Sequence, residues 1–393
     1  MDLGHSAIVY RENEWHVADY PKVGTVSQEH TFDETVVNLK EAKAARKIVF
    51  DRSSPLRLVL LTLAMVALSR VYSPLSSEES RLYARVREAQ NILWSEMEKR
   101  GWTDPVNDLD KTGFIGLDWS ETTTTLGFLE AKRNACDPLW AVQFLRWFDR
   151  LGLKAGDRVV VTSSASFPGM LYSMLAAAEF RGLAIDLTVS LGASAWGANR
   201  SEAPWPLLAR VLRAHDLLRT RPLFYTLGGN GENGDGMFPE GIEALKRAAR
   251  EDGVELFRSG QISDIIDRKM ALIAPEIAPN SSRVIGESAA RLVVSVGGNL
   301  SSLGLDEIVV TLRNGLLFQE DAAAAGDGVI ALSLRLGIPV LHLLNLRSLS
   351  QKVGIDFETR RPFFTGNTFL AALAGLTLFV LVLASHKRWT WES

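Results

Sequence analysis

Two serines stand in short polar turns that each follow a strand-like run of apolar residues. Ser166 lies in the turn 163–169, and Ser194 lies in the turn 190–199. A serine between a strand and the amino end of a helix has the position of an activated nucleophile in acyl transfer. Ser166 is therefore the leading candidate nucleophile, and Ser194, which lies between Gly192 and Gly197, is its rival. For each hydroxyl, a simpler role as a hydrogen-bond donor or a helix cap is the favoured alternative.

A serine nucleophile needs a general base, and histidine is the residue used most often. His215 and His342 are the only histidines between residues 73 and 362. His342 stands near the end of a strand-like run and is our candidate base, although a histidine at such a place is often a hydrogen-bonded core residue. Spacing in the sequence does not decide whether either imidazole reaches a serine.

Four polar turns share a position, because each follows a predicted strand: 163–169, 190–199, 228–236 and 297–302. In a parallel sheet such turns meet at the carboxyl edge, where open α/β sheets bind ligands. Glycines let backbone N–H groups approach an oxyanion closely, and a helix amino terminus adds partial positive charge. The turns match no strict phosphate-binding or hydrolase motif, so a tight connection without a ligand is the alternative for each. We predict a site for a carboxylate or phosphate, with these ligand-binding candidates: Ser164, Gly192, Asn199, Gly229, Gly298 and Asn299.

A run of threonines, 122–125, precedes a short stretch that carries Lys132 and Arg133. Threonine hydroxyls donate hydrogen bonds, and the planar guanidinium of arginine matches a carboxylate. Thr123, Thr124, Lys132 and Arg133 are therefore further candidates for binding a carboxylate-rich ligand. The alternative is a β-prone run followed by the solvated face of a helix.

The turns 163–169 and 190–199, together with the segments 121–127 and 129–133, resemble the poly-γ-glutamate system protein family. The resemblance extends from about Ser77 to about Asp356. It implies a membrane-associated accessory component found alongside the bacterial machinery that synthesises poly-γ-glutamate. The implied partners are membrane subunits of the synthase and a γ-glutamyl polymer or glutamate-containing intermediate. The resemblance thus implies a pathway rather than a reaction.

The elements that must position these residues alternate between strands and helices. The run 158–162, the apolar segment 170–180 and the run 184–189 form a predicted βαβ unit. The alternation continues with strands expected at 223–226, 254–257, 291–296, 307–312 and 339–343, and with helices at 77–100, 138–151, 207–218, 239–252, 262–273 and 329–336. We predict an α/β fold, a mainly parallel, doubly wound, Rossmann-like sheet with helices on both faces.

The composition excludes several classes of protein. The chain has 393 residues, of which 47% are hydrophobic, and a formal net charge of −3. Because there is no basic excess, nucleic-acid binding has no electrostatic support. The single cysteine, Cys136, cannot form an internal disulfide, and the scattered histidines and this cysteine predict no zinc or iron site, whereas magnesium held by carboxylates stays open. No particular cofactor is indicated.

Two apolar segments predict membrane spans on either side of the α/β domain. The segment 363–385 contains no charged residue and is long enough to span. The segment 55–72 reaches ~27 Å as a helix if its two arginines snorkel. Basic residues before the first segment favour a cytoplasmic amino terminus, so the domain 73–362 is expected outside and the tail 386–393 inside.

The amino-terminal region 1–54 is expected to be a cytoplasmic tail. Residues 1–34 are polar and show no sustained period, which predicts a flexible or loosely ordered tail. Residues 35–50 combine apolar residues at helical spacing with lysines and arginine, which predicts a basic helix suited to an anionic membrane face, or an ordinary extension of the anchor.

Three functions remain open on this evidence. The leading hypothesis is an accessory membrane component of poly-γ-glutamate biosynthesis or export that binds an anionic γ-glutamyl ligand through the polar turns, and the other two are alternatives. The second is a serine-type hydrolase or transferase that acts on γ-glutamyl amide bonds through Ser166 or Ser194. The third is a structural scaffold whose two helices pack against synthase subunits.

Overall fold

A computed structural model describes the α/β part of the chain and several short segments outside it. The described residues are 8–12, 14–20, 25–35, 37, 75–275, 289–357, 375 and 377. The chain divides into two compact units, and the larger one spans Leu75–Thr365. The candidate site lies in this larger unit.

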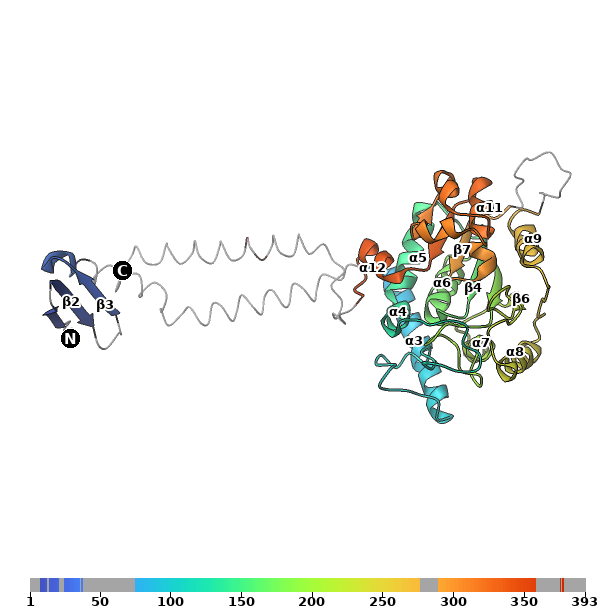
Figure 1. Ribbon diagram of the computed structural model, residues 1–393, viewed down its shortest axis with the longest axis horizontal. Coiled ribbons are helices and arrows are strands. Elements are labelled where there is room, and N and C mark those ends of the chain that lie inside the picture. Colours follow the sequence, from blue (N-terminus) through green and yellow to red (C-terminus); the bar gives the residue numbers. More distant parts are fainter. Residues whose placement is uncertain are drawn as a thin grey trace. The chain divides into compact units, whose positions relative to one another are not determined.

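The larger unit is built around a sheet of six strands in the order β6-β5-β4-β7-β9-β8 (Figure 1). Five of these strands are parallel, and only β8 runs antiparallel, against β9 at the edge of the sheet. The α/β fold with a mainly parallel sheet is therefore confirmed. The strands have these bounds: β4 Arg158–Ser164, β5 Ala184–Ser190, β6 Pro222–Thr226, β7 Leu292–Val296, β8 Gly315–Leu317 and β9 Val340–Leu343.

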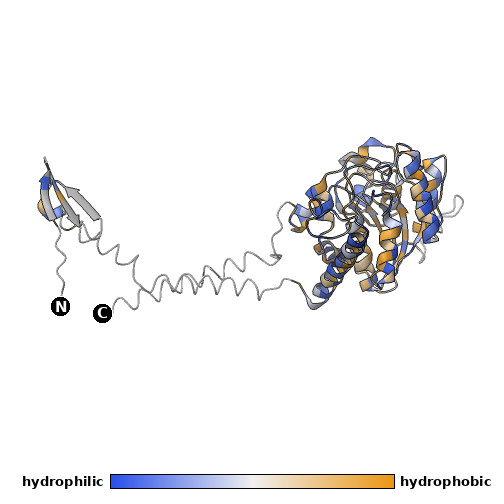
Figure 2. Cartoon of the chain, turned by 90° about the horizontal axis from the view of Figure 1, so that it is seen from below, coloured by the Kyte–Doolittle hydropathy of each residue, from blue (hydrophilic) through white to orange (hydrophobic). Residues whose placement is uncertain are grey.

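Helices cover both faces of the sheet, and consecutive residues of β4 divide between the two cores. Val159 and Val161 belong to one apolar cluster and Val160 to the other, as expected when side chains alternate along a strand. In Figure 2 the helices carry hydrophobic and hydrophilic residues on different sides. The first cluster contains residues of α3 Ser77–Lys99, α5 Leu139–Arg150, α6 Pro168–Arg181, α7 Trp205–Ala214 and α8 Pro239–Asp252, and the second contains residues of α9 Ile262–Ile273 and α11 Val329–Arg335.

Helix α6 connects β4 to β5 and fixes the turn that carries Ser166. Nearly all of its residues are buried, because Ala, Leu and Met dominate its sequence. Pro168 occupies its first turn, where no backbone N–H is needed, and Gly182 ends it with a φ of 76°, a conformation that favours glycine. The βαβ unit predicted from the sequence is thus formed by β4, α6 and β5.

The order of the strands creates a crevice at the carboxyl end of β4. The chain adds β5 and then β6 on one side of β4, and it returns to place β7 on the other side. The connections that leave β4 and β7 therefore diverge, and open α/β sheets bind ligands at such a switch point. Three shorter helices lie near this edge: α4 Leu129–Ala135, α10 Leu300–Leu303 and α12 Leu346–Val353.

Two of the predicted strands are wrong. Residues 307–312 were expected as a strand, but Glu307–Thr311 forms the 3-10 helix η1, whose first turn is capped by the Asp306 side chain. Two of the β-branched residues there, Ile308 and Thr311, are exposed rather than buried between two layers, so their strand propensity is overridden. Residues 254–257 contribute only an isolated bridge to Tyr225 of β6. The sequence also gave no indication of the 3-10 helix η2 Gln319–Ala324.

The expectation of a flexible or loosely ordered tail at residues 1–34 is also wrong for the residues of this range that the structure describes. Strands β1 Ile8–Glu12, β2 Trp15–Tyr20 and β3 Thr25–Glu29 form an antiparallel sheet in the order β1-β2-β3. These strands pair through their backbones although their sequences lack a sustained alternation of apolar and polar residues, which is the pattern that predicts a strand.

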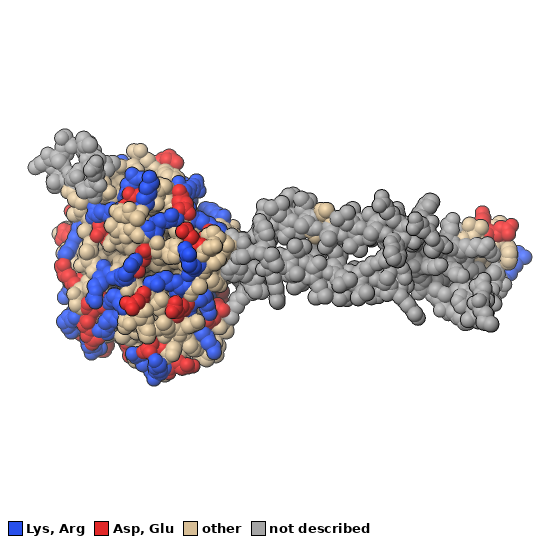
Figure 3. Space-filling model, turned by 180° about the vertical axis from the view of Figure 1, so that it is seen from behind, with Lys and Arg blue, Asp and Glu red and all other residues tan. Residues whose placement is uncertain are grey.

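The predicted basic helix and both predicted spans lie almost entirely outside the described residues. Within the part of the chain that the structure describes, no helix combines the length and the apolar character needed to cross a membrane. Basic and acidic side chains are interspersed over the face of the larger unit seen in Figure 3.

Candidate functional site

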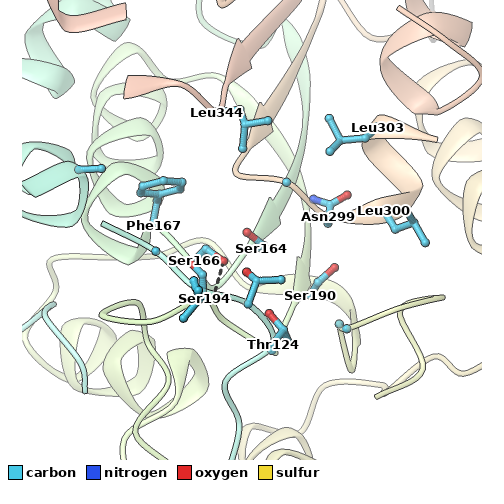
Figure 4. A pocket seen from close by; sticks show the side chains of 18 of the residues that line it. Thr124, Ser164, Ser166, Phe167, Ser190, Ser194, Asn299, Leu300, Leu303 and Leu344 are labelled. Carbon is cyan, nitrogen blue, oxygen red and sulfur yellow. Dashed lines mark hydrogen bonds between the residues drawn. The ribbon is translucent and has the colours of Figure 1, made fainter. Parts of the chain in front are cut away.

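A pocket of about 770 Å³ opens at the carboxyl edge of the sheet. Its lining includes residues from all four polar turns predicted from the sequence, which confirms that these turns converge. Figure 4 shows the side chains of several lining residues, with Ser164 between the Ser166–Ser194 pair and Asn299 in this view. Nine of the candidate residues line the pocket: Thr124, Lys132, Ser164, Ser166, Gly192, Ser194, Gly229, Gly298 and Asn299.

Ser194 and Lys132 form a hydrogen-bonded pair in this pocket, which we call the dyad. Lys132 Nζ lies 2.6 Å from Ser194 Oγ, and it also donates a hydrogen bond of 2.5 Å to the backbone oxygen of Ser166. The Ser166 hydroxyl accepts a hydrogen bond of 3.0 Å from the backbone N–H of Ser194. The turns after β4 and β5 are thereby joined through the dyad.

Burial of Lys132 disfavours its positive charge, since the side chain is 3% exposed. The Phe167 ring, whose centroid lies 3.8 Å from Nζ, and the Ser166 carbonyl oxygen favour the charged form. Burial lowers the pKa of Lys132 to about 7, and the Cys136 thiol opposes this only weakly. Among the described residues no carboxylate forms a salt bridge with Lys132. A neutral lysine within reach of a serine hydroxyl is a suitable general base near pH 7.

The segment 120–127, which we call the strap, holds this arrangement from one side. It pairs with the turn that carries Ser194, since Thr124 N donates to Ala193 O at 2.9 Å and Ala195 N donates to Thr125 O at 2.9 Å. At Gly127 an added Cβ would lie 2.9 Å from Ala195 O, so the strap passes directly over the dyad. Only glycine allows this approach without a shift of the backbone.

Thr123 and Asn199 position the strap rather than line the pocket. Asn199 Nδ2 donates to Thr123 Oγ1 at 2.9 Å and to Leu117 O at 2.8 Å, and its Oδ1 accepts from Leu117 N at 2.8 Å. Both side chains are buried. Their polar atoms are therefore engaged within the protein.

Arg133 also lies outside the pocket lining. Its guanidinium donates to the backbone oxygens of Asn107, at 2.8 Å, and Val106, at 3.2 Å. The neighbouring residues Lys132 and Arg133 thus point to different parts of the molecule. The prediction that both bind one ligand finds no geometric support for Arg133.

His342 does not occupy the position of a general base. It lies on β9, is 1% exposed and does not line the pocket. Burial lowers its pKa to about 4. His215 is an exposed residue at the end of α7. Lys132, which we had expected to bind the ligand as a cation, is the basic residue that reaches one of the two candidate serines.

A second polar cluster lies at the same edge of the sheet and surrounds the buried Glu232. Its Oε2 accepts hydrogen bonds from Ser190 Oγ at 2.7 Å and Thr226 Oγ1 at 2.6 Å, and it lies 3.5 Å from Lys269 Nζ. Its Oε1 accepts from Ser301 N at 2.7 Å. Burial opposes ionisation of Glu232, but the charge of Lys269 and the hydrogen bonds outweigh it and lower the pKa of Glu232. The glycine-rich turn 228–236 is thereby tied to the ends of β5, β6 and β7.

One feature of the sequence indicates this cluster. Lys269 follows Ile265 and precedes Ile273 at steps of four residues, so it stands on the apolar stripe of α9. A lysine on such a stripe needs a buried partner. Glu232 had no comparable signal, because it lies in a turn of glycines, asparagines and aspartate.

Two polar atoms of the pocket have no hydrogen-bond partner among the described residues: Ser164 Oγ and Asn299 Nδ2. Each of these side chains is 5% exposed. A buried polar group without a partner is uncommon in a native protein and is often completed by water or a ligand.

Within the described ranges, no group of histidine, cysteine, aspartate and glutamate side chains has the arrangement of a metal site. Burial raises the pKa of the Cys136 thiol far above its ordinary value. Comparison with known proteins found no matching family model, no matching curated protein and no matching solved structure. The pocket itself must therefore indicate the function.

Proposed function

We propose that this chain is an acyl-transfer enzyme, a serine hydrolase or transferase that cleaves γ-glutamyl amide bonds. Ser194 is the nucleophile and Lys132 is the general base. The observation that carries the proposal is the 2.6 Å contact between Lys132 Nζ and Ser194 Oγ in a pocket where burial lowers the pKa of Lys132 to about 7. A serine with lysine as its base is a known variant of the hydrolytic triad.

The reaction uses the dyad twice. Neutral Lys132 takes the proton of the Ser194 hydroxyl while Ser194 Oγ forms a bond to the amide carbonyl carbon. The carbon–nitrogen bond then breaks, the lysine gives its proton to the leaving amine, and an acyl ester remains on Ser194. Water, or the amine of an acceptor, next attacks the ester as Lys132 takes its proton. Release of the acyl group returns the proton to Ser194.

Ser166 has a positioning role in this scheme. Its hydroxyl accepts from the Ser194 backbone and its carbonyl oxygen accepts from Lys132, so it fixes both members of the dyad. A misplaced reacting group costs about 10²-fold in rate for a displacement of 1 Å. Loss of the Ser166 hydroxyl should therefore slow the reaction without abolishing it.

The γ-glutamyl substrate and the cellular setting follow from the family resemblance described above. The enzyme would belong to the poly-γ-glutamate machinery, where it would cleave or transfer γ-glutamyl chains. Residues 55–72 and 363–385 would anchor it in the bacterial cytoplasmic membrane with both termini inside and the α/β domain outside. The synthase membrane subunits would be its partners.

The test of the reaction compares the full-length chain with three variants on γ-linked polyglutamate, with α-linked polyglutamate as the control substrate. Ser194→Ala and Lys132→Met should each lower kcat by about 10³-fold or more, whereas Ser166→Ala should lower it less. Release of glutamate and the shortening of the polymer are measured. Turnover that persists in Ser194→Ala would exclude the proposed nucleophile.

The test of membrane topology uses a new surface cysteine, since the single native Cys136 is buried. Glu202 is exposed on the α/β unit, so Glu202→Cys provides a site for a membrane-impermeant maleimide. Labelling in intact cells is expected for an external domain. Labelling only after lysis would place the domain in the cytoplasm.

A second candidate function is binding of the γ-glutamyl chain without cleavage. The observation that favours it is that Lys132 has two further contacts, with the Ser166 carbonyl oxygen and the Phe167 ring, which suit a lysine that only stabilises the turns. Binding of γ-linked and α-linked polyglutamate is compared across a salt titration. A preference for the γ-linked chain that persists at high salt, without any turnover, would support this function.

A further inference from the structure

We propose that Ser164 and Asn299 form a carboxylate-binding subsite beside the dyad and that it holds an α-carboxylate of the substrate. This inference rests on the proposed function and specifies which part of the same pocket recognises the substrate. Both residues line the pocket, each is 5% exposed, and each has a polar atom without a partner among the described residues. Two such atoms in one pocket indicate a ligand group that completes their hydrogen bonds.

Ser164 is the last residue of β4, and its hydroxyl lies against the turn that follows β7. A Cβ added at Gly297 would lie 2.3 Å from Ser164 Oγ, so this close approach requires a glycine. Gly297 also has a φ of 78°, which favours glycine independently. The turn is therefore shaped around the Ser164 hydroxyl, although no described residue bonds to it.

The amide of Asn299 is oriented by its own contacts. Its Oδ1 accepts from Ser302 N at 3.0 Å and from Ser301 Oγ at 3.3 Å, and it lies 3.5 Å from Lys269 Nζ. An amide nitrogen could not accept these hydrogen bonds, so the assignment of oxygen and nitrogen is fixed. The positive charge beside Oδ1 polarises the amide and makes the free Nδ2 a stronger donor.

A carboxylate is the group that best matches these two atoms. Ser164 Oγ and Asn299 Nδ2 both donate, and an ionised carboxylate offers two oxygens that only accept. Hydrogen bonds to a charged acceptor are stronger than those to a neutral one. Arg347 contributes a positively charged side chain to the lining of the pocket. The carboxylate of Glu232 also lines the pocket, but it is already paired with Lys269.

The subsite and the dyad lie at the ends of neighbouring strands. Ser164 precedes Ser166 by two residues, and β4 pairs with both β5 and β7. In a γ-linked glutamate chain an α-carboxylate remains on the residue whose side-chain carbonyl forms the amide. Holding that carboxylate at Ser164 and Asn299 would orient the γ-carbonyl toward Ser194.

The test measures equilibrium binding to the full-length Ser194→Ala chain, which cannot turn over. The probes are a short γ-linked glutamate peptide, the same peptide with α-carboxamides, and monomeric glutamate. The carboxylate peptide should bind about tenfold or more tightly than the carboxamide. Tight binding of monomeric glutamate as well would assign the subsite to a free acid rather than to the polymer and would overturn the substrate part of the proposal.

Two added substitutions locate the subsite. Asn299→Asp keeps the oxygen that caps α10 and replaces the donor with an anionic oxygen, and Ser164→Ala removes the other donor. Each should weaken binding of the carboxylate peptide by about tenfold or more. Binding of the carboxamide peptide should change less, because its N–H₂ group can donate to the new oxygen in Asn299→Asp and its single oxygen accepts less strongly from Ser164 than a carboxylate does. Ser173→Ala is the matched control, because Ser173 has another buried hydroxyl without a partner but lies on α6 outside the pocket lining.

The outcomes separate this inference from the proposed reaction. Equal binding of the two peptides, or a preference that survives both substitutions, would overturn the subsite. If Asn299→Asp in the active chain instead lowers kcat equally on both peptides, the two donors serve the reacting oxygen and the carboxylate assignment is wrong. If the binding preference is found but the unmodified chain never cleaves the peptide, the subsite stands and the reaction fails.

Discussion

Replacing Lys132 with methionine should abolish turnover and make the stability of the chain respond differently to pH. Methionine is similar to lysine in length and is uncharged at every pH, so it fills the buried site without a titrating group. In the folded protein the pKa of Lys132 is lowered to about 7 from 10.5, because burial disfavours the ammonium form. Between these two pH values the unfolded chain holds a proton on this lysine that the folded chain has lost.

The sign of the effect follows from this difference in protons. Because the unfolded state binds more protons, raising the pH through this window stabilises the native wild type. The gain is about 1.4 kcal/mol for each pH unit well above pH 7 and less close to it. From pH 7 to pH 9 the free energy of unfolding of the wild type should therefore rise by about 2 kcal/mol relative to Lys132→Met.

The assay is urea unfolding of both full-length chains at several pH values, followed by the fluorescence of the buried Trp140 and Trp205. Other groups titrate in both chains, so the difference between the two curves isolates Lys132. Lys154→Met, at an exposed position, is the matched control for the loss of one lysine. Parallel curves for the wild type and Lys132→Met would refute the lowered pKa and with it the general base.

Three further predictions concern the same edge of the sheet. The kcat/KM of the wild type should rise with pH through about 7, because only neutral Lys132 accepts a proton. A kcat/KM that stays constant from pH 5 to 8 would contradict the role of Lys132 as general base. Gly127→Ala should lower kcat by about 10²-fold with little change in thermal stability. The added Cβ would lie 2.9 Å from Ala195 O and must displace the turn that carries Ser194. Full activity of this variant would show that the strap is not needed. Lys269→Met should destabilise the fold by about 3–5 kcal/mol in thermal or urea unfolding, because it leaves the carboxylate of Glu232 buried without its partner. The added change Glu232→Gln should recover much of this loss of stability. If the second change does not reduce the loss, the ion-pair explanation is refuted.

Much of the larger unit followed from local patterns in the sequence. The helices predicted at 239–252 and 262–273 have these bounds in the structure, and the predicted strands at 158–162 and 184–189 differ from β4 and β5 by one or two residues. Apolar periodicity sets such elements, and parallel strands bring their carboxyl ends together. The convergence of the four polar turns was predictable for this reason.

The chemistry of individual residues was less predictable, because it depends on burial and on contacts between distant segments. Lys132 and Arg133 are neighbours in the sequence, yet one is buried beside Ser194 and the other bonds to the backbone of a separate loop. Helix α4 has only 7 residues, so it offers too little periodicity to tell the buried side from the exposed one. The sequence therefore indicated the region of the site but assigned the base to His342.

The central claim is that Ser194 carries the acyl group, and mass spectrometry of the trapped intermediate tests it most directly. The full-length chain is mixed with a γ-glutamyl ester, quenched in acid within the first turnovers and digested. The mass of the γ-glutamyl group should appear on Ser194 and should be absent in Lys132→Met and Ser194→Ala. An adduct on Ser166, or turnover that continues without any adduct in Ser194→Ala, would contradict the account.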